Sequence, residues 1–334
     1  MRIRKLLRVR FVVDPFTEQE KIMAELTPMM QKYMETKEQY KDCILFYRLG
    51  DFYEMFFDDA LVASKELEIT LTGKSCGLEE RAPMCGIPYH AVEGYLSKLV
   101  SRGYKVAICE QVEDPKLAKG LVKREVIRVV TPGTNLNVQS LEAGKNNYLL
   151  SIAYTPDGIG ISAADVTTGD YYVTEVEDLK KLNDELMKYE PSEIICNEAF
   201  LVSGFDVNDL KSRLHISVNA LESHMFDDDG CRRILMKHFK VNTLIGLGVE
   251  EFPTGLLAAG ALLQYLYDTQ KTDLEHFTHI YPYLTSKYML LDSSTRRNLE
   301  LTETLREKQK RGSLLWVLDK TKTCLLYTSP SPRD

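Results

Sequence analysis

The 334-residue sequence has few of the features that mark secreted, membrane or metal-binding proteins. Its seven cysteines are an odd number, and none belongs to a Cys-x-x-Cys pair, which argues against a disulfide framework and against a zinc knuckle. No run approaches the roughly 18 apolar residues that a membrane span requires. The chain starts with a basic segment, 1–10, whose apolar stretch is interrupted by Arg8 and Arg10. It therefore does not resemble a signal peptide. We therefore predict a cytoplasmic protein with reduced, mostly buried thiols.

The sequence also lacks a nucleotide-binding loop. P-loop ATPases cradle phosphates with the string Gly-x-x-x-x-Gly-Lys-Ser/Thr, and this string does not occur. Segment 244–248 contains glycines, but no Lys-Ser or Lys-Thr pair accompanies them. We therefore predict that this chain is not an ATP-hydrolysing enzyme and that it holds no cofactor and no metal ion.

Negative charge is concentrated in the middle of the chain. The net charge is −7 overall, divided into +3 for residues 1–23, −2 for 24–139, −10 for 140–272 and +2 for 273–334. A phosphate backbone would repel the middle third. This part is therefore predicted to face a protein partner or solvent.

The first third has the pattern of a small mixed α/β domain. Thr27 and Pro28 are residue types expected at the N-cap and first position of a helix. Alternating strands and helices follow, including a short strand predicted at Ile69–Thr72. Residues 1–22 are predicted to be a tail or a non-native extension. The predicted ranges are 23–131 for the domain and 132–145 for a linker.

The next segment, 146–253, has the pattern of a second α/β domain. Three runs separated by turn residues predict an antiparallel meander, and a helix and a buried strand, Glu193–Cys196, follow. This order resembles the ribonuclease H-like arrangement, whose enzymes hold metal ions with carboxylates. Asp165 lies on the second strand without an evident partner carboxylate. A metal-dependent nuclease is therefore kept as an alternative function. The three predicted strands are Tyr148–Tyr154, Ile159–Val166 and Tyr171–Val176.

The last part is predicted to be helical. Thr254 is the expected cap of an apolar, buried helix at Gly255–Gln270, and a charged helix is predicted at Arg296–Gln309. Segment 324–334 has the Pro/Ser composition of an unfolded tail, and its abrupt onset suggests a truncated or mis-joined reading frame. The predicted ranges are 254–323 for the start of an all-α core and 324–334 for a disordered or artefactual tail.

Residues 50–57 combine an aromatic ring and a carboxylate two positions apart. In an extended backbone, positions i and i+2 face the same way, so Phe52 and Glu54 are predicted to project together. Tyr53 and Met55 are predicted on the other face, and Gly50 to re-aim the chain before them. Taken alone, these residues are better explained by a buried strand whose aromatics fill a core and whose Glu54 is solvated.

Several strings together closely resemble the N-terminal part of the MutS family of DNA mismatch repair proteins. The resemblance runs from about Thr27 to Thr323. It implies an α/β multidomain fold: a small mixed α/β mismatch-recognition domain, a ribonuclease H-like α/β connector domain and an incomplete all-α core segment. The strings are Phe46–Glu54, Gly86–Glu93, Ala107–Gln111, Val130–Thr134, Gly260–Tyr265 and Asp292–Glu300.

The resemblance implies roles for Phe52 and Glu54. In the family, the phenylalanine of this motif stacks on a mispaired base from the minor groove, and the glutamate hydrogen-bonds that base. A weakly paired base has less stacking and pairing to lose, so an inserted ring favours it. A protonated Glu54 would donate to a base nitrogen, whereas an ionised one would only accept. The chain is thus predicted to bind double-stranded DNA with mispaired or unpaired bases.

Further partners are implied for the full-length family only. Its members use ATP and Mg²⁺, act as homodimers, and contact a MutL-like protein through the connector. Because family members grip DNA with parts beyond these domains, a protein-docking fragment without DNA activity is a further alternative.

Six basic side chains are candidate contacts to the DNA backbone. Most lie in polar loops, where a solvated role is the competing interpretation. His90 lies near the start of a predicted helix, whose N-terminus favours phosphate. The candidates are Lys74, Arg81, His90, Lys119, Lys123 and Arg124.

Overall fold

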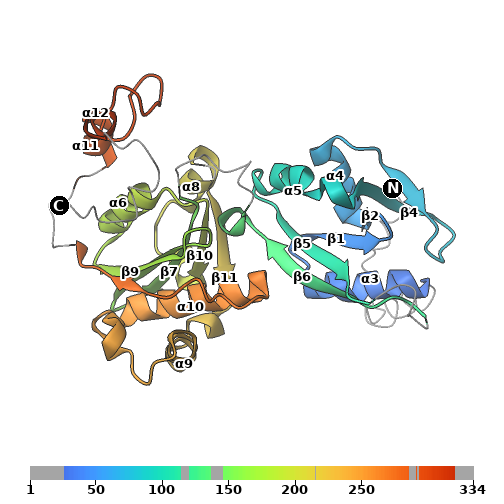
Figure 1. Ribbon diagram of the computed structural model, residues 1–334, viewed down its shortest axis with the longest axis horizontal. Coiled ribbons are helices and arrows are strands. Elements are labelled where there is room, and N and C mark those ends of the chain that lie inside the picture. The colour runs from blue at the N-terminus through green and yellow to red at the C-terminus, as the bar shows by residue number, and fades with distance from the viewer. Residues whose placement is uncertain are drawn as a thin grey trace, which may run out of the picture.

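The computed structural model describes residues 26–113, 120–136, 146–214, 216–285, 291 and 293–319. Two six-stranded sheets follow one another along this part of the chain, and each has helices on both faces (Figure 1). The predicted α/β multidomain fold is confirmed. The predicted tails, 1–22 and 324–334, lie outside the described residues. Within the described ranges, none of the helices combines the length and the apolar composition needed to cross a membrane.

The first sheet has the strand order β3-β4-β2-β1-β5-β6. Strand β1 is parallel to β5, and the other neighbouring strands are antiparallel. Apolar side chains on both faces of the central strands explain why helices cover both sides. The strands are β1 (Cys43–Leu49), β2 (Phe52–Phe56), β3 (Thr72–Lys74), β4 (Ala82–Pro88), β5 (Lys105–Gln111) and β6 (Arg124–Val130).

Two cores lie on opposite faces of this sheet. Tyr53 and Met55 of β2 point to the face covered by α4 and α5, whereas Phe56 points to the face covered by α3. The acidic residues at the start of α4 favour the positive end of the helix dipole. The helices are α3 (Pro28–Gln39), α4 (Phe57–Leu67), η1 (Tyr89–Ala91) and α5 (Val92–Val100).

The second sheet has the order β11-β10-β7-β8-β9-β12. Strands β7, β8 and β9 form the predicted antiparallel meander, and β10 lies parallel between β7 and β11. The predictions of the meander and of the buried fourth strand are confirmed. The strands are β7 (Tyr148–Thr155), β8 (Gly158–Asp165), β9 (Asp170–Val176), β10 (Glu193–Asn197), β11 (Ser217–Leu221) and β12 (Tyr281–Pro282).

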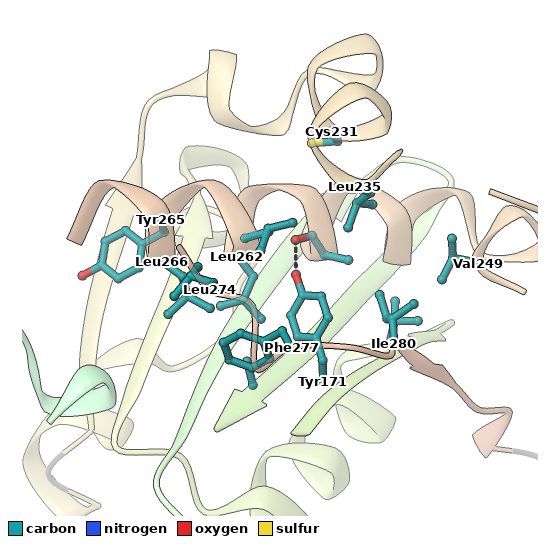
Figure 2. Packing of buried hydrophobic residues seen from close by; sticks show 14 of the residues in the cluster. Tyr171, Cys231, Leu235, Val249, Leu262, Tyr265, Leu266, Leu274, Phe277 and Ile280 are labelled. Atoms are coloured by element: carbon teal, nitrogen blue, oxygen red, sulfur yellow. Dashed lines mark hydrogen bonds between the residues drawn. The ribbon is translucent and has the colours of Figure 1, made fainter. Parts of the chain in front are cut away.

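Helices α9 and α10 cover one face of this sheet, and α6, α7 and α8 cover the other (Figure 1). Figure 2 shows Tyr171 of β9 reaching up to α10, where its hydroxyl donates to the carbonyl oxygen of Ala259 at 2.5 Å. The remaining elements are η2 (Pro132–Thr134), α6 (Leu179–Tyr189), α7 (Glu198–Leu201), α8 (Val207–Arg213), η3 (Ser223–Phe226), α9 (Asp228–Phe239), η4 (Ile245–Leu247), η5 (Val249–Glu251), α10 (Pro253–Gln270), α11 (Ser293–Asn298) and α12 (Leu314–Leu318).

The boundary predicted at residue 253 does not separate α10 from the second sheet. This helix packs on β7, β8 and β9, and almost its whole length is buried. The cap predicted at Thr254 is wrong, because the helix begins one residue earlier, at Pro253. The backbone N–H groups of Thr254 and Gly255 instead donate to the Glu175 carboxylate of β9 at 2.5 and 2.9 Å. A carboxylate from a neighbouring strand thus replaces the local cap.

Two further sequence predictions are wrong. The strand expected at Ile69–Thr72 is shifted to Thr72–Lys74, because Glu68 ends α4 in a left-handed conformation and the Ile69 N–H still donates to the Ser64 carbonyl.

The helix expected at Arg296–Gln309 ends at Asn298. Glu300 next adopts φ +47°, and its carbonyl accepts from the N–H of Leu314 at 2.9 Å. Without an apolar surface to pack against, a charged segment gains little from helix formation.

A buried carboxylate of the second domain holds the first residues of the predicted linker. Glu193 of β10 is fully buried. Its side chain accepts from the Gly133 N–H of η2 at 3.1 Å, from the Asn219 amide at 2.9 Å and from the Tyr265 hydroxyl of α10 at 2.8 Å. A Cβ on Gly133 would lie 2.9 Å from that of Leu149. The first residues of the predicted linker are therefore packed into the second domain, and residues 137–145 lie outside the described part.

We expect Glu193→Gln to lower the free energy of unfolding by about 1–3 kcal/mol, the cost of one buried unsatisfied polar group. The glutamine amide keeps the shape of the carboxyl but turns an N–H donor toward one of the three donors around it. Urea denaturation followed by circular dichroism measures the loss. Glu198→Gln, at an exposed position of α7, is the matched control, and equal stability of the two variants would contradict the role assigned to Glu193.

Candidate nucleic-acid interface

The hairpin between β1 and β2 presents Phe52 to solvent. Gly50 in its turn adopts φ +58°, a left-handed conformation that glycine adopts without a Cβ penalty. The chain then reverses, and Phe52 lies opposite Leu49 in the antiparallel ladder. Although it begins a strand of a mostly buried sheet, the Phe52 ring is 48% exposed. The re-aiming of the chain predicted for Gly50 is confirmed.

Side chains alternate along β2 as the sequence predicted. Tyr53 and Met55 are buried on the side of α4 and α5, and Phe56 is buried on the side of α3. Because alternate residues of a strand share a face, Phe52 and Glu54 lie on the same side as Phe56. On this side of β2, Phe52 is exposed, Glu54 is half-buried and Phe56 is buried. The Phe52 ring therefore lies at the edge of the sheet surface, and the Glu54 carboxylate lies deeper.

Gly86 of β4 lies beside these two side chains. It pairs with Glu54 across the ladder. A Cβ at this position would lie 3.6 Å from Glu54 Cγ and 4.0 Å from Phe52 Cδ1. Because Gly86 has no side chain, the space beside the Phe52 ring and the Glu54 carboxylate stays open. A larger residue at position 86 would fill this space.

The Glu54 carboxylate has a cationic partner. Lys74 Nζ of β3 lies 2.5 Å from Glu54 Oε2, and the side chains of the two residues are 34% and 17% exposed. The same ammonium lies 5.5 Å from the centre of the Phe56 ring. A residue predicted as a DNA-backbone contact is thus paired with the residue predicted to contact the base.

A second set of contacts holds the hairpin from the opposite face. The Arg48 guanidinium lies 3.2 Å from Glu110 and 3.9 Å from the centre of the Tyr89 ring, and its Nε donates to the Gly50 carbonyl at 2.5 Å. The Tyr53 hydroxyl also donates to Glu110. Burial, with the Glu110 carboxylate, raises the pKa of Tyr53, so the hydroxyl stays protonated as a donor. This network fixes the turn that carries Phe52.

Sequence reasoning missed the role of Arg48, Glu110 and Tyr89. All three lie inside strings that carried the family resemblance, but their partners come from different strands. Arg48 and Glu110, for example, are 62 positions apart. The sequence did contain one signal for the ion pair: the apolar strands β1 and β5 each carry a charged residue near their end, Arg48 and Glu110.

The other predicted basic contacts differ in their surroundings. Arg81 and His90 are exposed, and His90 lies edge-on to the Tyr89 ring. The Lys123 ammonium pairs with Glu125 at 2.6 Å. Arg124 donates to the backbone carbonyls of Arg48 and Val122 at 2.7 and 2.9 Å, which supports the hairpin. Lys119 lies outside the described residues.

The carboxylate considered for a nuclease has a structural role. Asp165 accepts from the Asn147 N–H at 3.0 Å and from both the N–H and the hydroxyl of Thr167 at 2.8 and 2.6 Å. Among the residues that the structure describes, no three His, Cys, Asp or Glu side chains gather where they would hold a metal ion. The geometry around Asp165 does not favour the nuclease alternative.

Fold and surface define a protein with two α/β domains, the first of which presents an exposed ring beside a carboxylate at a braced hairpin. Residues 27–139 match the family described as MutS domain I, and residues 147–278 match MutS domain II. The chain belongs to the MutS family.

Curated relatives named DNA mismatch repair protein MutS agree with this assignment. The chain is 70% identical over 303 residues to that of Lachnoclostridium phytofermentans, covering 91% of this chain and 32% of the relative. It is 54% identical to those of Ruminiclostridium cellulolyticum, over 306 residues, and Acetivibrio thermocellus, over 308 residues, covering 91% of this chain and 35% of each relative. The chain therefore spans about a third of the length of the relatives that it matches.

Proposed function

We propose that this chain recognises mispaired or unpaired bases in double-stranded DNA, with Phe52 as the wedge and Glu54 as the base contact. The observation that supports this most is the half-exposed Phe52 ring at a hairpin braced from the opposite face. A rigidly held apolar side chain inserts between base steps at a lower entropy cost than a mobile one.

The ring selects for weak pairing because insertion must unstack a base step. Unstacking costs a few kcal/mol per step, and this cost is smallest where the base is mismatched or unpaired. Discrimination of this kind depends on the deformability of the duplex and not on its sequence. Titration of the chain with two duplexes that differ only by one G·T pair tests the function. Equal affinities would reject mismatch recognition, and binding to neither duplex would favour a docking fragment without DNA activity.

Glu54→Gln is expected to alter discrimination more than affinity. Glutamine both donates and accepts hydrogen bonds, whereas a carboxylate only accepts, so the relative affinities for different mispairs should change by about tenfold. Affinity for a matched duplex should stay within about threefold, because phosphate contacts supply most of it. Competition titrations against G·T, A·C and unpaired-thymine duplexes measure both. Glu79→Gln, in the exposed loop before β4, is the control, and an unchanged ranking of mispairs in Glu54→Gln would exclude the base contact.

Arg81, His90, Lys119, Lys123 and Arg124 stay proposals as backbone contacts, whereas Lys74 already has the Glu54 carboxylate as its partner. We place the second domain, with its acidic charge, on the side away from DNA, where it would contact a MutL-like protein. Use of ATP and Mg²⁺ and homodimer formation are proposed for full-length relatives. Because the chain contains no P-loop string, we propose that it hydrolyses no ATP itself and that it acts in the cytoplasm.

A further inference from the structure

The ion pair between Lys74 and Glu54 lies where the proposed function brings a duplex. Lys74 is on β3, an edge strand of three residues. Glu54 is on β2, two strands away in the sheet order, and the side chains meet across β4. Gly86 of β4 lies beneath this contact, where a Cβ would be 3.6 Å from Glu54 Cγ, at ordinary van der Waals distance.

The pair shares a face with the wedge. Phe52, Glu54 and Phe56 alternate with the buried side chains of β2, and the Lys74 ammonium lies near both Glu54 and the Phe56 ring. Any duplex that brings a base onto Phe52 therefore brings its phosphates toward this pair. The Lys74 side chain is the more exposed of the two, so its charge is the more accessible to solvent.

A carboxylate at this position creates an electrostatic problem. An ionised Glu54 repels phosphates, and the repulsion is stronger near a protein surface than in bulk water. The domain has no basic excess to offset it, since residues 24–139 carry a net charge of −2. The positive charge that offsets the carboxylate must therefore come from close by.

We propose that Lys74 is a positioning residue for mismatch recognition: its ammonium neutralises the Glu54 carboxylate, so that Phe52 can dock on any duplex without repulsion. The inference rests on the proposed function, because it requires this face of β2 to meet DNA. On a matched duplex the carboxylate stays with Lys74. At a mispair it exchanges the ammonium for a base, and the ammonium is then available to a phosphate.

This role differs from that of an ordinary backbone contact. A lysine that only binds phosphate contributes the same amount whether residue 54 is charged or neutral. A lysine that also holds the Glu54 carboxylate in the ion pair contributes more while the carboxylate is present, because its removal frees that charge to turn toward the phosphates as well. A double-mutant cycle between the two positions separates these cases.

The test measures matched-duplex affinity at low salt for the wild-type chain, Lys74→Met, Glu54→Gln and the double variant. We expect Lys74→Met to weaken binding by about tenfold when Glu54 is present and by less than about threefold when glutamine replaces it. Lys74→Arg keeps the charge and should bind within about threefold of the wild type. Lys65→Met, at an exposed position of α4, controls for net charge, and thermal midpoints confirm that every variant is folded.

Equal losses on both backgrounds, or no loss on either, would overturn the proposal and leave Lys74 as a phosphate contact or a solvated residue. Failure of the proposed function has a different outcome. A wild-type chain that binds matched and mismatched duplexes equally rejects the wedge, while the cycle on the matched duplex still reports on the ion pair. A chain that binds neither duplex at low salt rejects both.

Discussion

Replacing Phe52 by alanine is expected to abolish the preference for a mismatched duplex. Stacking of an aromatic side chain on a base contributes about 1–3 kcal/mol, so affinity for a G·T duplex should fall by about 10- to 100-fold. Affinity for the matched duplex should change by less than about threefold, because it comes mainly from phosphate contacts. Because the ring is 48% exposed and begins a strand, its removal leaves no large cavity. Parallel titrations of both duplexes measure the two effects.

Tyr281→Ala provides a matched control for this variant. Tyr281 is also 48% exposed, but it lies on β12 at the edge of the second sheet. Its removal should leave the affinities for both duplexes unchanged. If Phe52→Ala still prefers the G·T duplex, or if Tyr281→Ala loses the preference equally, the assignment of the wedge is wrong.

Gly160→Ala is expected to cause the largest loss of stability. A Cβ at Gly160 of β8 would lie 2.0 Å from the carbonyl oxygen of Thr254 and 2.6 Å from the backbone nitrogen of Gly255. Both atoms belong to the backbone of α10, so a rotamer change cannot relieve the overlap. Overpacking of a rigid core costs typically 1–3 kcal/mol, and we expect about 3 kcal/mol here. Urea denaturation monitored by circular dichroism measures the loss.

Gly246→Ala is the control for the glycine substitution. A Cβ at Gly246 meets no atom within 4 Å, so alanine there should leave the urea midpoint unchanged or slightly raised. A Gly160→Ala chain as stable as the Gly246→Ala chain would show that α10 does not lie against β8 as described.

Local patterns predicted the elements that carry the site. The two-residue period of a strand was enough to place Phe52 and Glu54 on one face and Tyr53 and Met55 on the other, and the structure confirms this. The antiparallel meander was predictable for the same reason, because turn residues separate its strands at short range.

Contacts between distant segments were not predictable in this way. Lys74 and Glu54 are 20 positions apart, and Glu193 and Tyr265 are 72 apart. No local pattern specifies which strands bring such side chains together. The helix expected at Arg296–Gln309 failed for a related reason, since propensity alone does not hold a charged segment helical without a surface to pack on.

The most direct test of the wedge is the fluorescence of 2-aminopurine placed next to a G·T mispair. Stacking quenches this base, so insertion of a side chain at the neighbouring step should increase its emission. We expect an increase when the wild-type chain binds the mismatched duplex, and none with the matched duplex or with Phe52→Ala at saturating protein. An equal increase with Phe52→Ala, or no increase with the wild-type chain bound at the mispair, would contradict the assignment of Phe52 as the residue that unstacks the base.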